Sequence, residues 1–181
     1  DGGGSSKLFS LPFSQLLLSW PAQGILLAQT PAASGIAGAA FSIDAKSGAA
    51  TALLSASGLT ATADRTFGRL LYQTSEGGRS TYSFNVRTGI ATPLAFDPMP
   101  ELCRWSLTAS NTVYCPAPFE AQNDSYTDLW HLGAATSPNA IFSFDASTGR
   151  PTTIATPGSS DGGEPADIAE LIVSKSDKYL L

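Results

Sequence analysis

The side chains best suited to binding or catalysis gather in one stretch of the chain, residues 116–139. This stretch contains Phe119, Glu120, Asp124, Tyr126, Asp128, Trp130 and His131. Aromatic rings beside carboxylates in a long loop can stack on a sugar, hold a peptide or coordinate Ca²⁺. Alternatively, Tyr126 and Trp130 fold back and cap a neighbouring sheet. We predict binding contacts from Phe119, Asp124, Tyr126, Asp128, Trp130 and His131, with capping as the alternative.

No convincing catalytic motif accompanies these residues. His131 is the only histidine and is interpreted as a structural imidazole. Residues 158–162 have the Gly-x-Ser-x-Gly spacing of a hydrolase nucleophile, but no helix pattern follows, so we attribute the match to chance. Paired carboxylates such as Glu120 and Asp124 serve a glycosidase only at a separation that depends on the fold. We predict no catalytic residue, no zinc site and no cofactor; Ca²⁺ has no support beyond the carboxylates.

The two cysteines, Cys103 and Cys115, are placed symmetrically about Ala109. A hairpin centred there puts them opposite each other and pairs Trp105 with Val113 on the same face. Opposed residues of antiparallel strands lie within the range that a disulfide bridges. The alternative is two buried free thiols. A disulfide would imply an oxidising, extracytoplasmic compartment, which is periplasmic, secreted or on the cell surface.

One short pattern, which occurs three times, must position these residues. Residues 41–51, 82–92 and 142–152 each read aromatic, Ser, apolar, Asp or Asn, two variable residues, Ser or Thr, Gly, two variable residues, Thr. The aromatic and the apolar residue lie on one face of a strand. The Asp or Asn bonds to the nearby backbone and the Gly takes a positive φ, so the chain reverses. The pattern predicts a repeated hairpin.

The spacing of these hairpins predicts an all-β fold, a partial β-propeller with about three complete four-stranded antiparallel blades and partial blades at both ends. Gly48, Gly89 and Gly149 are separated by steps near 40 and 60 residues, and a period near 40 with four strands is typical of a propeller blade. The chain is expected to be one propeller fragment, with blades at 13–56, 57–98 and 99–158. Partial blades are expected at 5–12 and 166–181.

The positions of the expected strands follow from the spacing of the repeated hairpins. They lie at residues 6–12; 15–20, 24–29, 39–44 and 50–55; 59–63, 69–74, 80–85 and 90–95; 102–107, 111–116, 140–145 and 152–156; and 168–174 and 178–181. The connections fall into two sets at opposite ends of the strands. We name the ends the short-turn rim (44–48, 64–68, 85–89, 108–110 and 145–149) and the long-loop rim (30–38, 96–101, 117–139 and 157–167). Long loops on a rigid scaffold usually carry binding sites, so the long-loop rim is the predicted binding surface.

Composition narrows the class of partner. Charged residues make up 14% of the chain, and the net charge is −5 with 10 Lys and Arg scattered singly. A nucleic-acid groove needs clustered basic residues, so we expect no nucleic-acid partner. The apolar run at residues 8–28 is interrupted by Pro12, Gln15, Pro21, Gln23 and Gly24, which favours two strands over a transmembrane segment.

Several short motifs resemble those of one group of β-propellers. They are Cys103-Arg-Trp-Ser, Tyr114-Cys-Pro-Ala-Pro, Tyr126-Thr-Asp-Leu-Trp and the hairpin at residues 142–149. With these motifs the chain resembles WD-repeat-like and Tol-complex-like bacterial β-propellers, closest to uncharacterised exported bacterial propeller proteins. The Gly-His and Trp-Asp dipeptides of eukaryotic WD repeats are absent. The resemblance implies architecture and export, and it transfers no activity because propellers host many functions.

The functional prediction is a non-catalytic binding or scaffold propeller of an exported bacterial protein. It would engage a protein or glycan ligand through the long-loop rim. The alternative is a propeller-type hydrolase acting on a glycan or peptide, with Asp124, Asp128 or His131 as acid or base. A purely structural spacer would be favoured if Tyr126 and Trp130 are fully buried.

Overall fold

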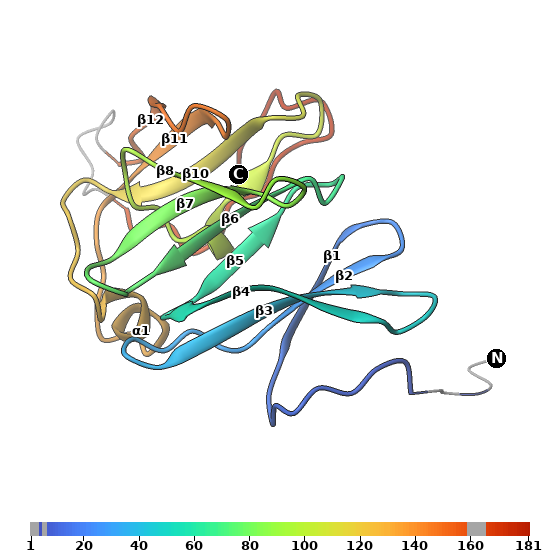
Figure 1. The fold of residues 1–181 in the computed structure, drawn as a ribbon. Coiled ribbons are helices and arrows are strands. Elements are labelled where there is room, and N and C mark those ends of the chain that lie inside the picture. The colour runs from blue at the N-terminus through green and yellow to red at the C-terminus, as the bar shows by residue number, and fades with distance from the viewer. Residues whose placement is uncertain (1–3, 5–6, 159–165) are drawn as a thin grey trace.

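Three antiparallel sheets of four strands each form nearly all the regular structure (Figure 1). The computed structural model describes residues 4, 7–158 and 166–181. The first sheet contains β1 (Leu17–Ala22), β2 (Ile25–Gln29), β3 (Ala37–Asp44) and β4 (Ala50–Ser57). The second contains β5 (Thr60–Ala63), β6 (Arg69–Thr74), β7 (Ser80–Asn85) and β8 (Ile90–Pro93). The third contains β9 (Arg104–Trp105), β10 (Thr112–Pro118), β11 (Asn139–Asp145) and β12 (Pro151–Ala155).

The predicted all-β class is confirmed, and in every sheet the strands lie side by side in chain order. The strand positions agree with the repeat except near the start of the third sheet. There a 3₁₀ helix, η1 (Pro100–Leu102), occupies part of the expected strand and leaves β9 with two residues. A second helix, α1 (Tyr126–His131), was not predicted. Neither described helix is long or apolar enough to cross a bilayer.

The predicted strands at the two ends of the chain differ from what forms. Of the expected strand at residues 6–12, the described part, 7–12, has no regular secondary structure and pairs with no strand. Phe9 and Leu11 pack instead on the outer face of the first sheet, against Leu26 and Ile43. At the other end, Ile172 and Leu181 exchange two backbone hydrogen bonds and Val173 pairs with Leu180, so residues 172–181 make a short antiparallel hairpin.

Two hydrogen bonds of the repeated turn recur in all three sheets. A side-chain oxygen of the first turn residue accepts backbone N–H groups two residues later, at Asp44, Asn85 and Asp145. The glycine four residues later donates its N–H to the carbonyl of that first residue at 2.8–2.9 Å, and its φ lies between 67° and 73°. Because this region favours glycine, the predicted reason for Gly48, Gly89 and Gly149 is confirmed.

A further backbone bond joins each of these turns to its neighbour in the same sheet. The residue that follows the Asp or Asn of the turn donates its backbone N–H to the carbonyl of the residue just before the second strand of the sheet. These bonds run from Ala45 to Gly24, from Val86 to Gly68 and from Ala146 to Asn111, at 2.8–3.0 Å. The two turns at the short-turn rim of each sheet are therefore held together without any side chain.

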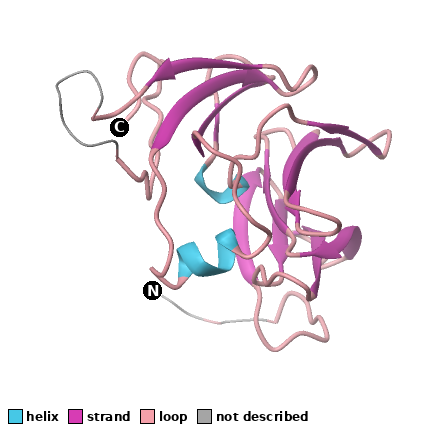
Figure 2. Cartoon of the chain, turned by 90° about the vertical axis from the view of Figure 1, so that its left-hand side faces the viewer, coloured by secondary structure: helices cyan, strands magenta, loops and turns pink. Residues whose placement is uncertain are grey.

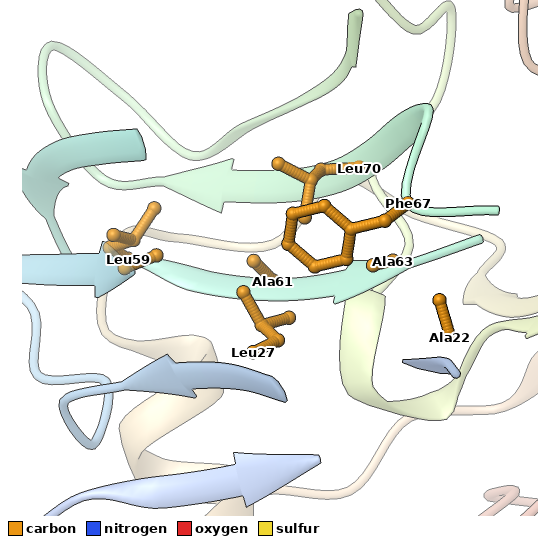
Figure 3. Close-up of a cluster of buried hydrophobic side chains, with 8 residues drawn as sticks. Ala22, Leu27, Leu59, Ala61, Ala63, Phe67 and Leu70 are labelled. Atoms are coloured by element: carbon orange, nitrogen blue, oxygen red, sulfur yellow. The ribbon is translucent and has the colours of Figure 1, made fainter. Parts of the chain in front are cut away.

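Apolar side chains between adjacent sheets form the core. Leu27 from β2 packs in one cluster with Leu59, just before β5, and with Ala61 and Leu70 of the second sheet, and the ring of Phe67 lies beside Leu70 and Ala63 (Figure 3). On the opposite face of the second sheet, Leu71 packs against a second cluster that includes Val113, Phe144 and both cysteines. The second sheet is thus covered on both faces.

The cysteines form the predicted disulfide. Val113 pairs with Trp105 and Tyr114 with Arg104, which is the register expected from the spacing and sets Cys103 opposite Cys115 with Cα atoms 4.3 Å apart. Both residues are buried. The disulfide holds β9, a strand of only two residues, to β10, and an oxidising environment fits it.

Replacing both cysteines by alanine should lower the free energy of unfolding by about 3 kcal/mol, since a bridge closing a loop of this size restricts the unfolded chain by that amount. Urea unfolding of the wild type and of Cys103→Ala/Cys115→Ala measures the difference. Thiol titration in denaturant should detect no thiol before reduction. Two titratable thiols in the unreduced protein would contradict the disulfide.

Two glycine substitutions should separate backbone strain from packing of the N-terminal segment. Gly89→Ala meets no atom within 4 Å, so only its positive φ opposes it, at a cost of about 1–2 kcal/mol. In Gly48→Ala the new Cβ would lie 1.9 Å from the Leu8 carbonyl oxygen, so we expect about 1 kcal/mol or more in addition. Equal urea midpoints for the two variants would show that residue 8 does not lie over this turn.

Candidate functional site

Helix α1 lies in the long-loop rim, in the loop between β10 and β11. Its first turn closes with Leu129 N–H donating to Ser125 O at 3.0 Å, and Gly133, with φ of 68°, ends it. Asp128 in the first turn and His131 in the last both have the charge sign that stabilises a helix dipole. Six residues are too few for an isolated helix, so contacts with other loops must hold it.

The first sheet contacts α1 through Asp128. Its Oδ2 accepts the backbone N–H and the hydroxyl of Ser34 at 2.8 and 2.7 Å, and Ser34 lies in the loop between β2 and β3. Asp128 is therefore committed to fixing a loop that lies 94 residues away in the sequence.

The second sheet contacts α1 through a buried chain of polar groups. The Thr127 hydroxyl donates to Gln73 Oε1 at 2.9 Å. The Gln73 amide in turn donates to the Pro98 carbonyl and to the Thr81 hydroxyl, at 2.9 and 3.2 Å. These contacts satisfy the polar side chain that β6 carries into the interior, and buried polar groups need such partners.

Arg79 lies beneath the start of α1 with only 8% of its surface exposed. Its backbone N–H donates to Asp124 Oδ1 at 2.9 Å, and its guanidinium carbon lies 5.3 Å from the centre of the Tyr126 ring. Burial lowers the pKa of Arg79, and the nearby Asp97, Tyr126 and Glu101 oppose that shift. Burial also raises the pKa of Asp97, which accepts the Thr81 N–H. Arg79 balances these carboxylates and supports Tyr126 by a cation–π contact.

His131 and Glu101 join α1 to η1, and Figure 2 shows these two helical segments beside each other. His131 Nε2 lies 3.1 Å from Glu101 Oε1, while Oε2 accepts the Thr60 hydroxyl at 2.9 Å. The hydrogen bond to Glu101 raises the pKa of His131 above its ordinary 6.5, against the effect of burial. Nearly half of the His131 side chain, 47%, remains exposed, so the imidazole is both anchored and accessible.

The segment after the third sheet contacts α1 through Trp130. The Trp130 indole N–H donates to Asp167 Oδ2 at 3.1 Å, and the Asn139 side chain donates to the other oxygen at 2.9 Å. Loops from all three sheets therefore meet at this one short helix.

The predicted site residues thus have different roles. Asp124 and Asp128 accept backbone N–H groups from other loops, Tyr126 is buried, and Trp130 is partly buried. Phe119 is 55% exposed and makes no aromatic contact among the described residues. The nucleophile-like Ser160 lies outside the described residues. Within the described ranges, no group of three or more His, Cys, Asp or Glu side chains could hold a metal ion.

Several residues that build this site were not predicted: Ser34, Gln73, Arg79, Asp97 and Glu101. A polar Gln73 inside an apolar strand was the one signal that the sequence offered. Next to the site, an open depression of about 600 Å³ is lined by Ser34, Gly35, Ser75, Asn123, Asp124 and Ser125.

Comparison with known proteins finds similarity to solved structures. No protein-family model and no curated protein matches the chain. A solved structure described as the crystal structure of the eukaryotic initiation factor is similar over 92% of this chain, with 16% identity and a TM-score of 0.47. This chain covers 36% of that protein's length.

The His131–Glu101 pair should make stability depend on pH. Because the folded state raises the His131 pKa, its contribution is full below the unfolded value near 6.5 and is lost as pH rises through the folded value. Glu101→Gln should therefore destabilise the protein more at about pH 5.5 than at about pH 8.5, by roughly 0.2–1 kcal/mol for such an exposed pair. Urea unfolding at both pH values measures this.

Glu120→Gln is the matched control, since Glu120 is exposed on the same rim and its carboxylate has no hydrogen bond among the described residues. The control should lose little stability at either pH. If both variants show the same pH dependence, the effect belongs to the net charge of the rim and not to the pair.

Proposed function

We propose that the three sheets are consecutive blades of a β-propeller, at residues 13–56, 57–98 and 99–158, with partial blades at 5–12 and 166–181. The shared strand order and the hydrogen bonds that recur in the three turns support this. The C-terminal hairpin adds support, because its turn repeats the β5–β6 turn. Phe67 and Asp177 have φ of 56° and 55°, and each donates its N–H to the carbonyl three residues earlier.

The protein acts as a non-catalytic binding or scaffold module, extracytoplasmic in an exported bacterial protein of the WD-repeat-like and Tol-complex-like kind. The observation that carries the proposal is the clamping of α1 by loops of all three sheets, which makes the long-loop rim one preorganised surface. Preorganisation lowers the entropic cost of binding. From this surface Phe119, His131 and Leu132 project.

The ligand chemistry follows from what the rim exposes. Apolar Phe119 and Leu132 lie among acidic residues that include Glu120 and Asp124. The described loops of this rim contain no Lys or Arg, and Arg79, in the adjoining loop between β6 and β7, is buried. A protein partner with an apolar patch bordered by Lys or Arg complements such a surface better than a neutral glycan does.

The hydrolase alternative has one observation in its favour, the accessible imidazole of His131 held by Glu101. Such a pair can act as a general base. Against it, Asp124 and Asp128 are occupied by backbone N–H groups, and no described hydroxyl or thiol is hydrogen-bonded to the imidazole. We therefore favour binding over catalysis.

Alanine substitutions at His131 and Phe119 separate the two functions. If the rim binds a protein, Phe119→Ala should weaken a captured partner about tenfold or more, as expected for loss of an aromatic anchor. Neither the wild type nor His131→Ala should hydrolyse any member of a panel of glycans and peptides. Turnover that disappears in His131→Ala would show that the protein is an enzyme. Ile90→Ala, an exposed residue on β8 away from the rim, is the control.

A further inference from the structure

Opposite the long-loop rim, the chain carries most of its positive charge. Lys46, Arg65, Arg69, Arg87, Lys175 and Lys178 lie in the short turns, at the adjoining strand ends, or in the C-terminal turn that Asp177 bonds to residues 106–108. The carboxylates of this rim, such as Asp44 and Asp64, accept N–H groups of their own turns. These six of the ten Lys and Arg residues thus lie at one end of the protein. The short turns of this end are at the right of Figure 1, while α1 lies at the left.

Three adjoining cavities run across this end between the turns. The first, of about 240 Å³, is lined by Trp20, Arg65 and Trp105 among others. It shares Arg65 and Trp105 with a second of about 370 Å³. The second shares Asp64, Thr66 and Ser110 with a third of about 300 Å³, which Arg69 and Arg87 line. Because neighbouring cavities share walls, they form one groove, which we call the arginine groove.

Four arginines line this groove, and one of them, Arg104, donates from its guanidinium to the carbonyls of Glu101 and Cys103. The other three guanidinium groups can bind an anion, although Asp145 lies within electrostatic reach of Arg69. In the part of the chain that the structure describes, the one ion pair within 4.0 Å joins His131 and Glu101. Arg65, Arg69 and Arg87 have no side-chain hydrogen bond within those residues either. An arginine fork matches the geometry of carboxylate and sulfate groups and stays charged at any relevant pH.

Two indoles give the groove a second chemistry. Trp20, on β1, is 62% exposed, and an open indole face is a surface on which a sugar ring can stack. Trp105 is 7% exposed, and its indole N–H finds no acceptor among the described residues. A buried unpaired donor is costly unless a water or a ligand oxygen satisfies it.

We propose that the arginine groove binds an extended anionic polysaccharide. Its carboxylate or sulfate groups pair with Arg65, Arg69 and Arg87, and one sugar ring stacks on Trp20. The disulfide favours a glycan over a nucleic acid, since it fits an environment outside the cytoplasm. This surface lies at the opposite end from the long-loop rim, so the proposal stands whether or not that rim binds a protein.

The test compares two triple variants of the 181-residue chain that remove the same charge. The first variant, Arg65→Gln/Arg69→Gln/Arg87→Gln, removes three positive charges from the groove. The second, Lys46→Gln/Lys175→Gln/Lys178→Gln, removes three positive charges from the same rim but leaves the groove unchanged. Isothermal titration with polygalacturonate and with dextran sulfate distinguishes carboxylate from sulfate, and neutral dextran is the blank. The groove variant should lose about tenfold or more in affinity, because three charge-assisted contacts disappear. The control should lose about threefold or less, since only long-range attraction changes.

Trp20→Ala keeps the test valid if the triple variant folds poorly, because this side chain is largely exposed. It should weaken polysaccharide binding by about tenfold, as expected for a lost stacking contact. Equal losses in the two triple variants would overturn the proposal, since binding would then follow net charge alone. Tighter binding of single-stranded DNA than of either polysaccharide would also overturn it, as would no binding of either polysaccharide.

Discussion

The rest of the structure depends on the bond pattern of the repeated turn. An Asp or Asn side chain accepts the next amides, a glycine closes the turn, and one more backbone bond ties it to the neighbouring turn. A turn of fixed length sets the register of the strands that it joins, and a register shift of one residue would exchange the two faces of a strand. The turn therefore decides which side chains face the core between sheets and which line the ends.

The opposite end is held in another way. Its loops are long and share no common pattern, and a six-residue helix joins them through side chains. Each contact satisfies a polar group that would be costly to leave unpaired, such as the Gln73 amide or the Asp167 carboxylate. The acidic residues of this rim therefore serve mainly as hydrogen-bond acceptors for neighbouring loops. Exposed side chains such as Phe119, His131 and Leu132 are displayed by a framework that is already ordered.

The different ways in which the two rims are held also explain why positive charge lies at the short-turn rim and negative charge at the long-loop rim. Lys46, Arg65 and Arg87 occupy positions of the short turns that face solvent and need no partner, so they are placed there without cost to the fold. The long loops instead need acceptors for backbone amides, and carboxylates such as Asp124 and Asp128 supply them. A chain with a net charge of −5 can therefore present a positive surface at one end.

The sequence by itself predicted most strands of the three sheets and the pairing of Cys103 with Cys115, because each follows from hydrogen bonds between residues close in the chain. It did not predict η1, the unpaired segment at residues 7–12 or the form of the C-terminal hairpin. It indicated that the loop at residues 117–139 carries the candidate site residues. It did not predict α1, since a helix this short is stable only through contacts with other loops. Tertiary structure alone decided that Asp128 meets Ser34, 94 residues away, and that Arg65 and Arg87 line one groove. Such contacts depend on how separate sheets pack, which no local pattern records.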